Sequence, residues 1–412
     1  MFPWQQILEL ILSRTLAVYF EPAFWIILAF IGMQYWQAKR SQQKMFGANV
    51  YSLRHQIVLA GFYGTLGGVL ASFLLTIVGV TLNNLGFNYI WPLALLLTFI
   101  NTRFLCFAYA GGIVAVSSIL FGWPNVNVPQ VLALVAILHV TESLLIAIGG
   151  RYSALPLFIK RQNGQVVGAF TLQNFWPMPL VLLVAAAVPI GDNPVAVKMA
   201  DWWPMIPLAM DPPEGQKWIY AMMPVVAALG YTDMAVTSLP HKRRLESALH
   251  LGIYSIVLLV LALLSAKYTW LQIIPALICP LGHELLIQMD NRRETEGEPL
   301  FVPPANGVMV LDTVLDTPAR KIGLKTGDII YSLAGMNVNC GSDLAEAIAF
   351  APPEFNIAYE REGKRQQRMM KFLKGERRLG IILVPEGHEE YYAVMSTENF
   401  AIVDWFKRFK KK

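Results

Sequence analysis

We single out five ionisable residues of this 412-residue chain that lie within apolar stretches, where a charged side chain is costly and a functional role is the default hypothesis. They are His139, Glu142, Asp233, His283 and Glu284. His139 and Glu142 are three positions apart, so both would lie on one face of a helix. Imidazole and carboxylate groups of this kind can bind a metal ion and activate a water molecule.

A hydrolytic zinc site on a helix needs two histidines four positions apart, with a glutamate after the first. His283-Glu284 is followed by Ile287 where the second histidine is required, and the segment His139-Val-Thr-Glu142 supplies only one histidine. The resemblance to site-2-type intramembrane metalloproteases is therefore incomplete, although folding could still bring these residues together. A His139–Glu142 hydrogen bond or an interhelical polar contact is the preferred interpretation. We predict no catalytic residue, no metal and no cofactor.

Other short motifs indicate packing rather than chemistry. The three cysteines, Cys106, Cys279 and Cys340, form no CxxC pair, which argues against a disulfide framework or a thiolate metal site. Gly64 and Gly68 are four positions apart and predict close helix packing, with a dimer seam as the alternative. The net charge of +5 is carried by loops between apolar segments, so we predict no nucleic-acid partner.

The composition indicates a membrane protein. Hydrophobic residues make up 55% of the chain and charged residues 15%, against about 25% charged in an ordinary soluble domain. The charges are also unevenly distributed, with 28 in the first 293 residues and 33 in the last 119. Residues 1–293 are therefore predicted to form a multi-pass α-helical bundle in the lipid bilayer, followed by a soluble domain.

A membrane-spanning helix needs about 20 apolar residues, and nine segments approach that length, which predicts eight or nine spans. They are approximately Pro22–Trp36, Gln56–Leu82, Phe87–Ile100, Phe104–Phe121, Val128–Gly149, Phe175–Ile190, Trp218–Val236, Ala248–Ala266 and Trp270–Gln288. The opening stretch Gln5–Phe20 is better explained as an interfacial or re-entrant helix. Most loop Lys and Arg residues fall on one side of this arrangement, the side of Arg292 and Arg293. The positive-inside rule then places the C-terminal domain in the cytoplasm.

Residues 294–375 carry a second kind of signal, a small α+β domain with closely spaced glycines. Its motif residues are Pro318, Ala319, Gly323, Leu324, Gly327 and Asp328. This spacing resembles the bacterial form of the PDZ domain. Gly323 and Gly327 would relieve crowding at tight turns, and Asp328 can accept hydrogen bonds from nearby amides.

The resemblance implies a groove that binds an extended peptide as an added strand. Carried over to this chain, the groove would comprise Asn306, Gly307, Val308, Met309 and Val310 of one strand with Leu344, Ala347 and Ile348 of one helix. Pro303-Pro304 and Asn306-Gly307 stand in place of the eukaryotic Gly-Leu-Gly-Phe loop. Whether the ligand is a free C-terminus or an internal segment therefore stays open.

The last segment, 376–412, is an extension of the domain. Its beginning, Arg378–Val384, could add another strand, and its basic-aromatic end, Trp405–Lys412, could adsorb to anionic lipid or remain solvated.

Many spans followed by one cytoplasmic PDZ domain resemble the MinJ-type division-topology proteins of rod-shaped Gram-positive bacteria. That resemblance implies a non-enzymatic scaffold of the cell membrane, enriched at septum and poles, which bridges DivIVA to the MinC–MinD pair. Homo-oligomerisation is left open. Two alternatives remain: a divergent metalloprotease whose PDZ domain selects substrates, and a transporter or lipid-handling protein regulated by that domain.

Overall fold

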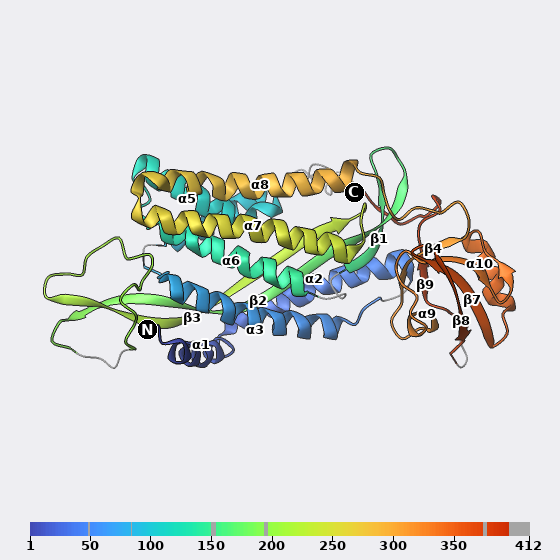
Figure 1. Ribbon diagram of the computed structural model, residues 1–412, viewed down its shortest axis with the longest axis horizontal. Coiled ribbons are helices and arrows are strands. Elements are labelled where there is room, and N and C mark those ends of the chain that lie inside the picture. Colours follow the sequence, from blue (N-terminus) through green and yellow to red (C-terminus); the bar gives the residue numbers. More distant parts are fainter. Residues whose placement is uncertain (48–49, 84, 150–153, 193–196, 374–376, 395–412) are drawn as a thin grey trace, which may run out of the picture.

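The computed structural model describes residues 1–47, 50–83, 85–149, 154–192, 197–373 and 377–394. The molecule is elongated, with helices packed around a long β-hairpin and the C-terminal domain at one end (Figure 1). The helices of the first region are α1 (Trp4–Val18), α2 (Pro22–Phe46), α3 (Leu53–Val78), α4 (Phe87–Ile100), η1 (Thr102–Leu105), α5 (Phe107–Phe121), α6 (Val128–Ile148), α7 (Pro240–Lys267), η3 (Thr269–Gln272) and α8 (Ile273–Glu296).

Four described helical segments are long and apolar enough to cross a bilayer: α3, α6, α7 and η3–α8. A fifth results if α1 and α2, which are bent by 72° at their junction, count as one broken span. Helices α4 and α5 are apolar but shorter. The structure therefore supports a membrane-associated protein, but the predicted eight or nine helical spans are not reproduced among the described residues.

The two segments predicted as helices at Phe175–Ile190 and Trp218–Val236 are strands instead. They belong to β2 (Val166–Pro189) and β3 (Gln216–Ala235), which pair antiparallel along the hairpin at the centre of Figure 1. Pro177 and Pro179 give the physical reason, because a proline inside a helix removes a hydrogen bond and clashes with the preceding turn. In a strand, the backbone nitrogens of residues two positions apart point to the same edge. Both prolines can therefore lie on the edge of β2 that faces away from β3, where they need not donate a hydrogen bond to another strand.

That open edge of β2 is covered by α3. A Cβ added to Gly64 would lie 2.2 Å from the carbonyl oxygen of Pro177, and one added to Gly68 would lie 2.4 Å from that of Pro179. Four residues of helix and two residues of strand advance by nearly the same length, about 6 Å and 6.6 Å. Gly64 and Gly68 therefore allow strand β2 of the same chain to pack closely on α3. The sequence alone predicts a second helix, or a second copy of the chain, at this position.

Side chains satisfy the remaining amides on this edge. The acceptors are Tyr35 Oη for Phe175 N–H at 3.0 Å, Ser72 Oγ for Val181 N–H at 2.8 Å, and Asn83 Oδ1 for Ala185 N–H at 2.8 Å. An apolar solvent cannot supply such partners, so a strand edge in that setting must be covered in this way.

The C-terminal domain is a strand-rich unit whose main sheet has the order β8-β7-β5-β4-β9. Its elements are β4 (Val308–Thr313), α9 (Pro318–Lys321), β5 (Ile329–Leu333), β6 (Met336–Asn337), α10 (Gly341–Phe350), β7 (Glu354–Arg361), β8 (Lys364–Lys371) and β9 (Ile381–Leu383). The strand foreseen in Arg378–Val384 is confirmed as β9, so the sheet extends past the predicted domain end at residue 375.

The domain packs directly against the first region. The Phe170 and Phe301 rings are 5.3 Å apart, and Gly168 N–H donates to the Phe301 carbonyl at 2.9 Å. Strand β10 (Ala393–Val394) returns to pair in parallel with β1 (Ala154–Lys160). The basic-aromatic tail Trp405–Lys412 lies outside the described residues.

Candidate functional site

The six signature residues shape the turns and the core of the domain. Pro318, Ala319 and Leu324 are buried, and Gly323 and Gly327 have positive φ angles of 81° and 88°, which glycine adopts without strain. Both glycines therefore form the tight turns that the spacing predicted.

Asp328 is the buried polar member of this signature. It accepts a hydrogen bond from the Lys325 amide at 2.8 Å, as expected, and two from the Arg361 guanidinium at 2.7 Å each. The hydrogen bond with Asp328 raises the pKa of Arg361 above its ordinary value. The pair fixes the turn before β5 to the end of β7.

Strand β4, the predicted groove strand, has no free edge. It pairs with β5 through Val308 and Met309 on one side, and with β9 through Val310 on the other. Asn306 is exposed in the preceding turn, where Gly307 adopts a positive φ of 79°. A peptide cannot add to this strand in this arrangement, so the position predicted for the groove from Asn306 to Val310 is corrected.

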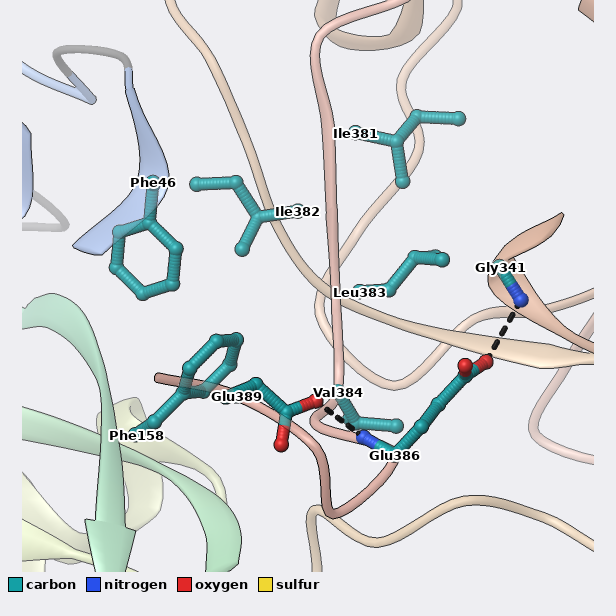
Figure 2. A pocket seen from close by; sticks show the side chains of 9 residues that line it. All are labelled: Phe46, Phe158, Gly341, Ile381, Ile382, Leu383, Val384, Glu386 and Glu389. Atoms are coloured by element: carbon teal, nitrogen blue, oxygen red, sulfur yellow. Dashed lines mark hydrogen bonds between the residues drawn. The ribbon is translucent and has the colours of Figure 1, made fainter. Parts of the chain in front are cut away.

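The edge strand next to β4 is β9, and its two faces differ. Ile381 and Leu383 are half-buried and pack against the domain core, as does Ile348 of α10. Ile382 is buried on the other face, against the membrane region. Figure 2 shows this alternation, with Ile382 directed toward Phe46 and Leu383 away from it.

Helix α10 supplies the second wall. Of its predicted groove residues, Leu344 and Ala347 are buried in the core, whereas Ile348 is half-buried. Asp343 caps the helix by accepting the amides of Asn339 at 2.9 Å and Cys340 at 3.3 Å. The hydrogen bond from Asn339 is the largest cause that lowers the pKa of Asp343.

The turn that leads into β9 is tightly constrained. Gly380 has a φ of 71°, and a Cβ at this position would lie 2.3 Å from the Thr317 side chain. Its carbonyl accepts the Val314 amide at 2.8 Å. In the sequence, the Leu379-Gly380 pair before an apolar run is the signal for this edge, although the run by itself predicts only one more strand.

A cavity of about 270 Å³ lies along β9. It is lined by Phe46, Phe158, Gly341, the four residues from Ile381 to Val384, Glu386 and Glu389 (Figure 2). Glu386 accepts the amide of Gly341, the first residue of α10, at 2.6 Å. The cavity therefore lies between β9 and the first region of the chain, and two acidic residues contribute to its lining.

The polar residues of the apolar stretches form two separate clusters. In the first, the buried Arg243 lies 2.9 Å from Asp233, 3.2 Å from Asp290 and 3.7 Å from Glu294. Glu294 also accepts the amides of Val236 and of the residue after it. Arg243 thus joins β3, α7 and α8, and its partner Asp233 belongs to this cluster rather than to that of His139 and His283.

The second cluster joins His139 and His283, as folding was expected to allow, but around a cysteine. Cys106 Sγ lies 3.2 Å from His139 Nε2 and 3.8 Å from His283 Nε2. Glu284 is engaged nearby, with Arg103 at 2.9 Å and the Tyr109 hydroxyl at 2.6 Å. The three Cys106 and histidine ligand atoms lie within 4.8 Å of one another.

Glu142 stands apart from both clusters. It is half-buried on α6, and His139 Nδ1 bonds the Val135 carbonyl at 2.7 Å. With His139 Nε2 directed at Cys106, the ring contacts Cys106 and Val135 rather than Glu142. Of the two predicted arrangements, the interhelical polar contact is the one observed, between His139 of α6 and Cys106 at the start of α5.

Comparison with known proteins finds a PDZ domain in the part of the chain that forms the C-terminal domain. The PDZ domain family matches residues 284–371. The cell division topological determinant MinJ of Bacillus subtilis is 24% identical over 271 residues, which cover 64% of this chain and 63% of MinJ. The chain thus matches slightly less than two thirds of that relative's length.

Other matches are confined to shorter segments. The putative serine protease HhoA of Synechocystis is 26% identical over 23% of this chain and 21% of its own, and the serine protease HTRA1 of Xenopus tropicalis is 42% identical over 12% and 10%. Among solved structures, the PDZ domain of a Listeria monocytogenes SdrC-like protein is 26% identical, covering 19% of this chain and 90% of that one, with a TM-score of 0.18. The chain is thus similar to MinJ over much of its length and contains a segment that matches the PDZ domain family.

Proposed function

We propose that this protein is a non-enzymatic membrane adaptor for division-site topology, and that its PDZ groove lies between β9 and α10. The observation that carries the proposal is the sheet order, which leaves β9 as the edge strand beside a helix with a half-buried apolar residue. Backbone pairing at such an edge gives affinity, and side-chain pockets give specificity.

The ligand would run antiparallel to β9, with its apolar side chains over Ile348, Ile381 and Leu383. The turn at Gly380 marks the end where a terminal carboxylate would meet backbone amides. At the opposite end, Glu386 and Glu389 would favour basic residues in the upstream part of the peptide.

The basic ends of several helices support a cytoplasmic position for the domain. Lys44, Arg54, Arg243 and Arg293 lie at the ends of α2, α3, α7 and α8 that are nearest the PDZ domain (Figure 1). Lys and Arg concentrate on the cytoplasmic side of membrane proteins. We propose the division-topology role, with DivIVA and MinC–MinD as partners and septum and poles as the site, on the similarity to MinJ.

The test is a substitution in the groove that spares the core. Ile348→Lys places a charge on the groove wall, and Ala345→Lys places the same charge on an exposed position of the same helix. In dividing cells, a fluorescent fusion of the I348K protein should lose septal and polar enrichment while remaining in the membrane. The A345K fusion should localise like the unmodified protein.

Unchanged localisation of the I348K protein would contradict the groove's role. A uniform membrane signal from the unmodified protein would contradict the division-topology role itself.

A further inference from the structure

The cluster of Cys106, His139 and His283 is the part of the molecule that the adaptor function does not use. These residues come from three segments: the residue before α5, the middle of α6 and the middle of α8. Cys106 is separated from the two histidines by 33 and 177 positions in the sequence. We propose that the three side chains form a binding site for a zinc ion.

The distances fit tetrahedral zinc. Bonds of about 2.3 Å to sulfur and about 2.0 Å to nitrogen place these ligand atoms roughly 3.5 Å apart. The two observed sulfur–nitrogen distances, 3.2 Å to His139 and 3.8 Å to His283, lie on either side of that value. A thiolate with two imidazoles is a soft donor set that suits zinc.

The hydrogen bonds of His139 prepare it to bind a metal. Its Nδ1 lies 2.7 Å from the Val135 carbonyl oxygen, which can only accept, so Nδ1 carries the proton and donates it. The lone pair is then on Nε2, the atom that faces Cys106. Metal-binding histidines are commonly held in one tautomer by such a bond to a backbone carbonyl.

A simple hydrogen bond between the Cys106 thiol and the His139 ring does not explain why His283 also lies at this place. His283 Nδ1 is buried and has no hydrogen-bond partner among the described residues. The His283 ring nevertheless packs 5.1 Å from the His139 ring, centroid to centroid. The ligand atoms of Cys106, His139 and His283 all lie within 4.8 Å of one another, so a single ion can contact the thiol and both rings at once.

The surroundings favour a bound cation with one open position. Tyr109 and Tyr254 pack on the His283 ring at centroid distances of 5.3 Å and 6.0 Å. Glu284 is already paired with Arg103 and with the Tyr109 hydroxyl, and so it is not assigned as a ligand. Three protein ligands leave the fourth place for water or an exogenous group.

Metal content of the full-length protein, purified in detergent without an affinity tag, tests the site. After equilibration with Zn²⁺ and removal of free ion, elemental analysis should find one zinc per chain. Cys106→Ser and His283→Gln should each weaken Zn²⁺ binding by about tenfold or more. The matched controls Cys340→Ser and His388→Gln, both in the C-terminal region, should retain the ion.

Cobalt substitution shows whether the sulfur itself is bound. Co²⁺ should give a sulfur-to-cobalt charge-transfer absorption that the C106S protein lacks and the C340S protein keeps. Circular dichroism and gel filtration should match across the variants, so that loss of metal is separable from loss of fold. A protein that takes up neither ion, or C106S and H283Q proteins that bind zinc like the controls, would overturn the proposal.

Discussion

The first region of the protein holds two polar clusters that differ in how their charges are balanced. Around Arg243, both terminal nitrogens reach carboxylates of Asp233 and Asp290, with Glu294 close to Nε. Around Cys106, one sulfur and two imidazole nitrogens that could bind a metal lie close together, and no ion pair joins these three side chains. The first cluster is a network of ion pairs within the chain, in which Arg243 Nε makes no hydrogen bond, and the second leaves His283 Nδ1 without a hydrogen-bond partner among the described residues.

An ionisable group in an apolar stretch is therefore not by itself a functional site. Asp233 and His283 look equivalent in the sequence, yet Asp233 is paired with the Arg243 guanidinium, which joins β3, α7 and α8. What separates Asp233 from His283 is whether the chain itself supplies a partner of opposite charge.

Removing Arg243 should have the largest effect. The Arg243→Met change leaves Asp233, Asp290 and Glu294 close together without their cation, and breaking a buried ion pair costs about 3–5 kcal/mol. Denaturant unfolding in detergent measures this loss. Arg292→Met, at an exposed pair with Glu296, should cost less than about 1 kcal/mol. Equal stabilities of the R243M and R292M proteins would remove the contrast between buried and exposed pairs.

The Cys106 cluster should behave in the opposite way. Without metal, Cys106→Ser should change the free energy of unfolding by less than about 1 kcal/mol. With Zn²⁺ at 100 times its dissociation constant, the unmodified protein should gain about 2.7 kcal/mol and the C106S protein should gain none. Thermal unfolding with and without Zn²⁺ makes the measurement. Equal stabilisation of both proteins would mean that zinc acts elsewhere.

The Asp328–Arg361 pair extends the comparison to the PDZ domain. Asp328→Ala removes the acceptor of three hydrogen bonds, and should destabilise the domain by about 1–3 kcal/mol. Hydrogen exchange of β5 and β7 in the full-length protein reports the change. Glu354→Ala, at an exposed pair with Lys371, is the control and should leave exchange unchanged. Equal exchange in both variants would show that the Asp328 pair contributes no stability.

The smallest expected effect concerns the cap of α10. Because hydrogen bonds lower the pKa of Asp343 in the folded state, its carboxylate stabilises the domain above the ordinary aspartate pKa. That stability should be lost as the pH falls through the lowered pKa. Asp343→Asn should reduce this acid-side dependence of unfolding, whereas Asp316→Asn, at an exposed position, should not. An unchanged acid limb in D343N would contradict the assignment.

The PDZ domain was predictable from the sequence because its turns depend on local residue types. Gly323 and Gly327 need positive φ angles, and Asp328 bonds an amide three positions away. The free edge was not predictable in the same way. It depends on β9 returning from beyond the recognised motif to pair with β4, a contact set by tertiary structure.

The β-hairpin shows a different limit. A run of apolar residues does not distinguish a buried helix from a buried strand. The spacing of Pro177 and Pro179 favoured a strand, but the partner of that edge, α3, lies far away in the sequence. Likewise, Cys106 had no neighbouring cysteine or histidine, so its place beside His139 and His283 became visible only in three dimensions.

The most direct test of the adaptor account is photo-crosslinking from β9 in dividing cells. With p-benzoylphenylalanine in place of Leu383, the account predicts a crosslinked partner that disappears when Ile348→Lys is added. The same group in place of Met309, on β4, should give no such product. Crosslinking from position 309 but not from position 383 would contradict the assignment of the groove to β9 and α10.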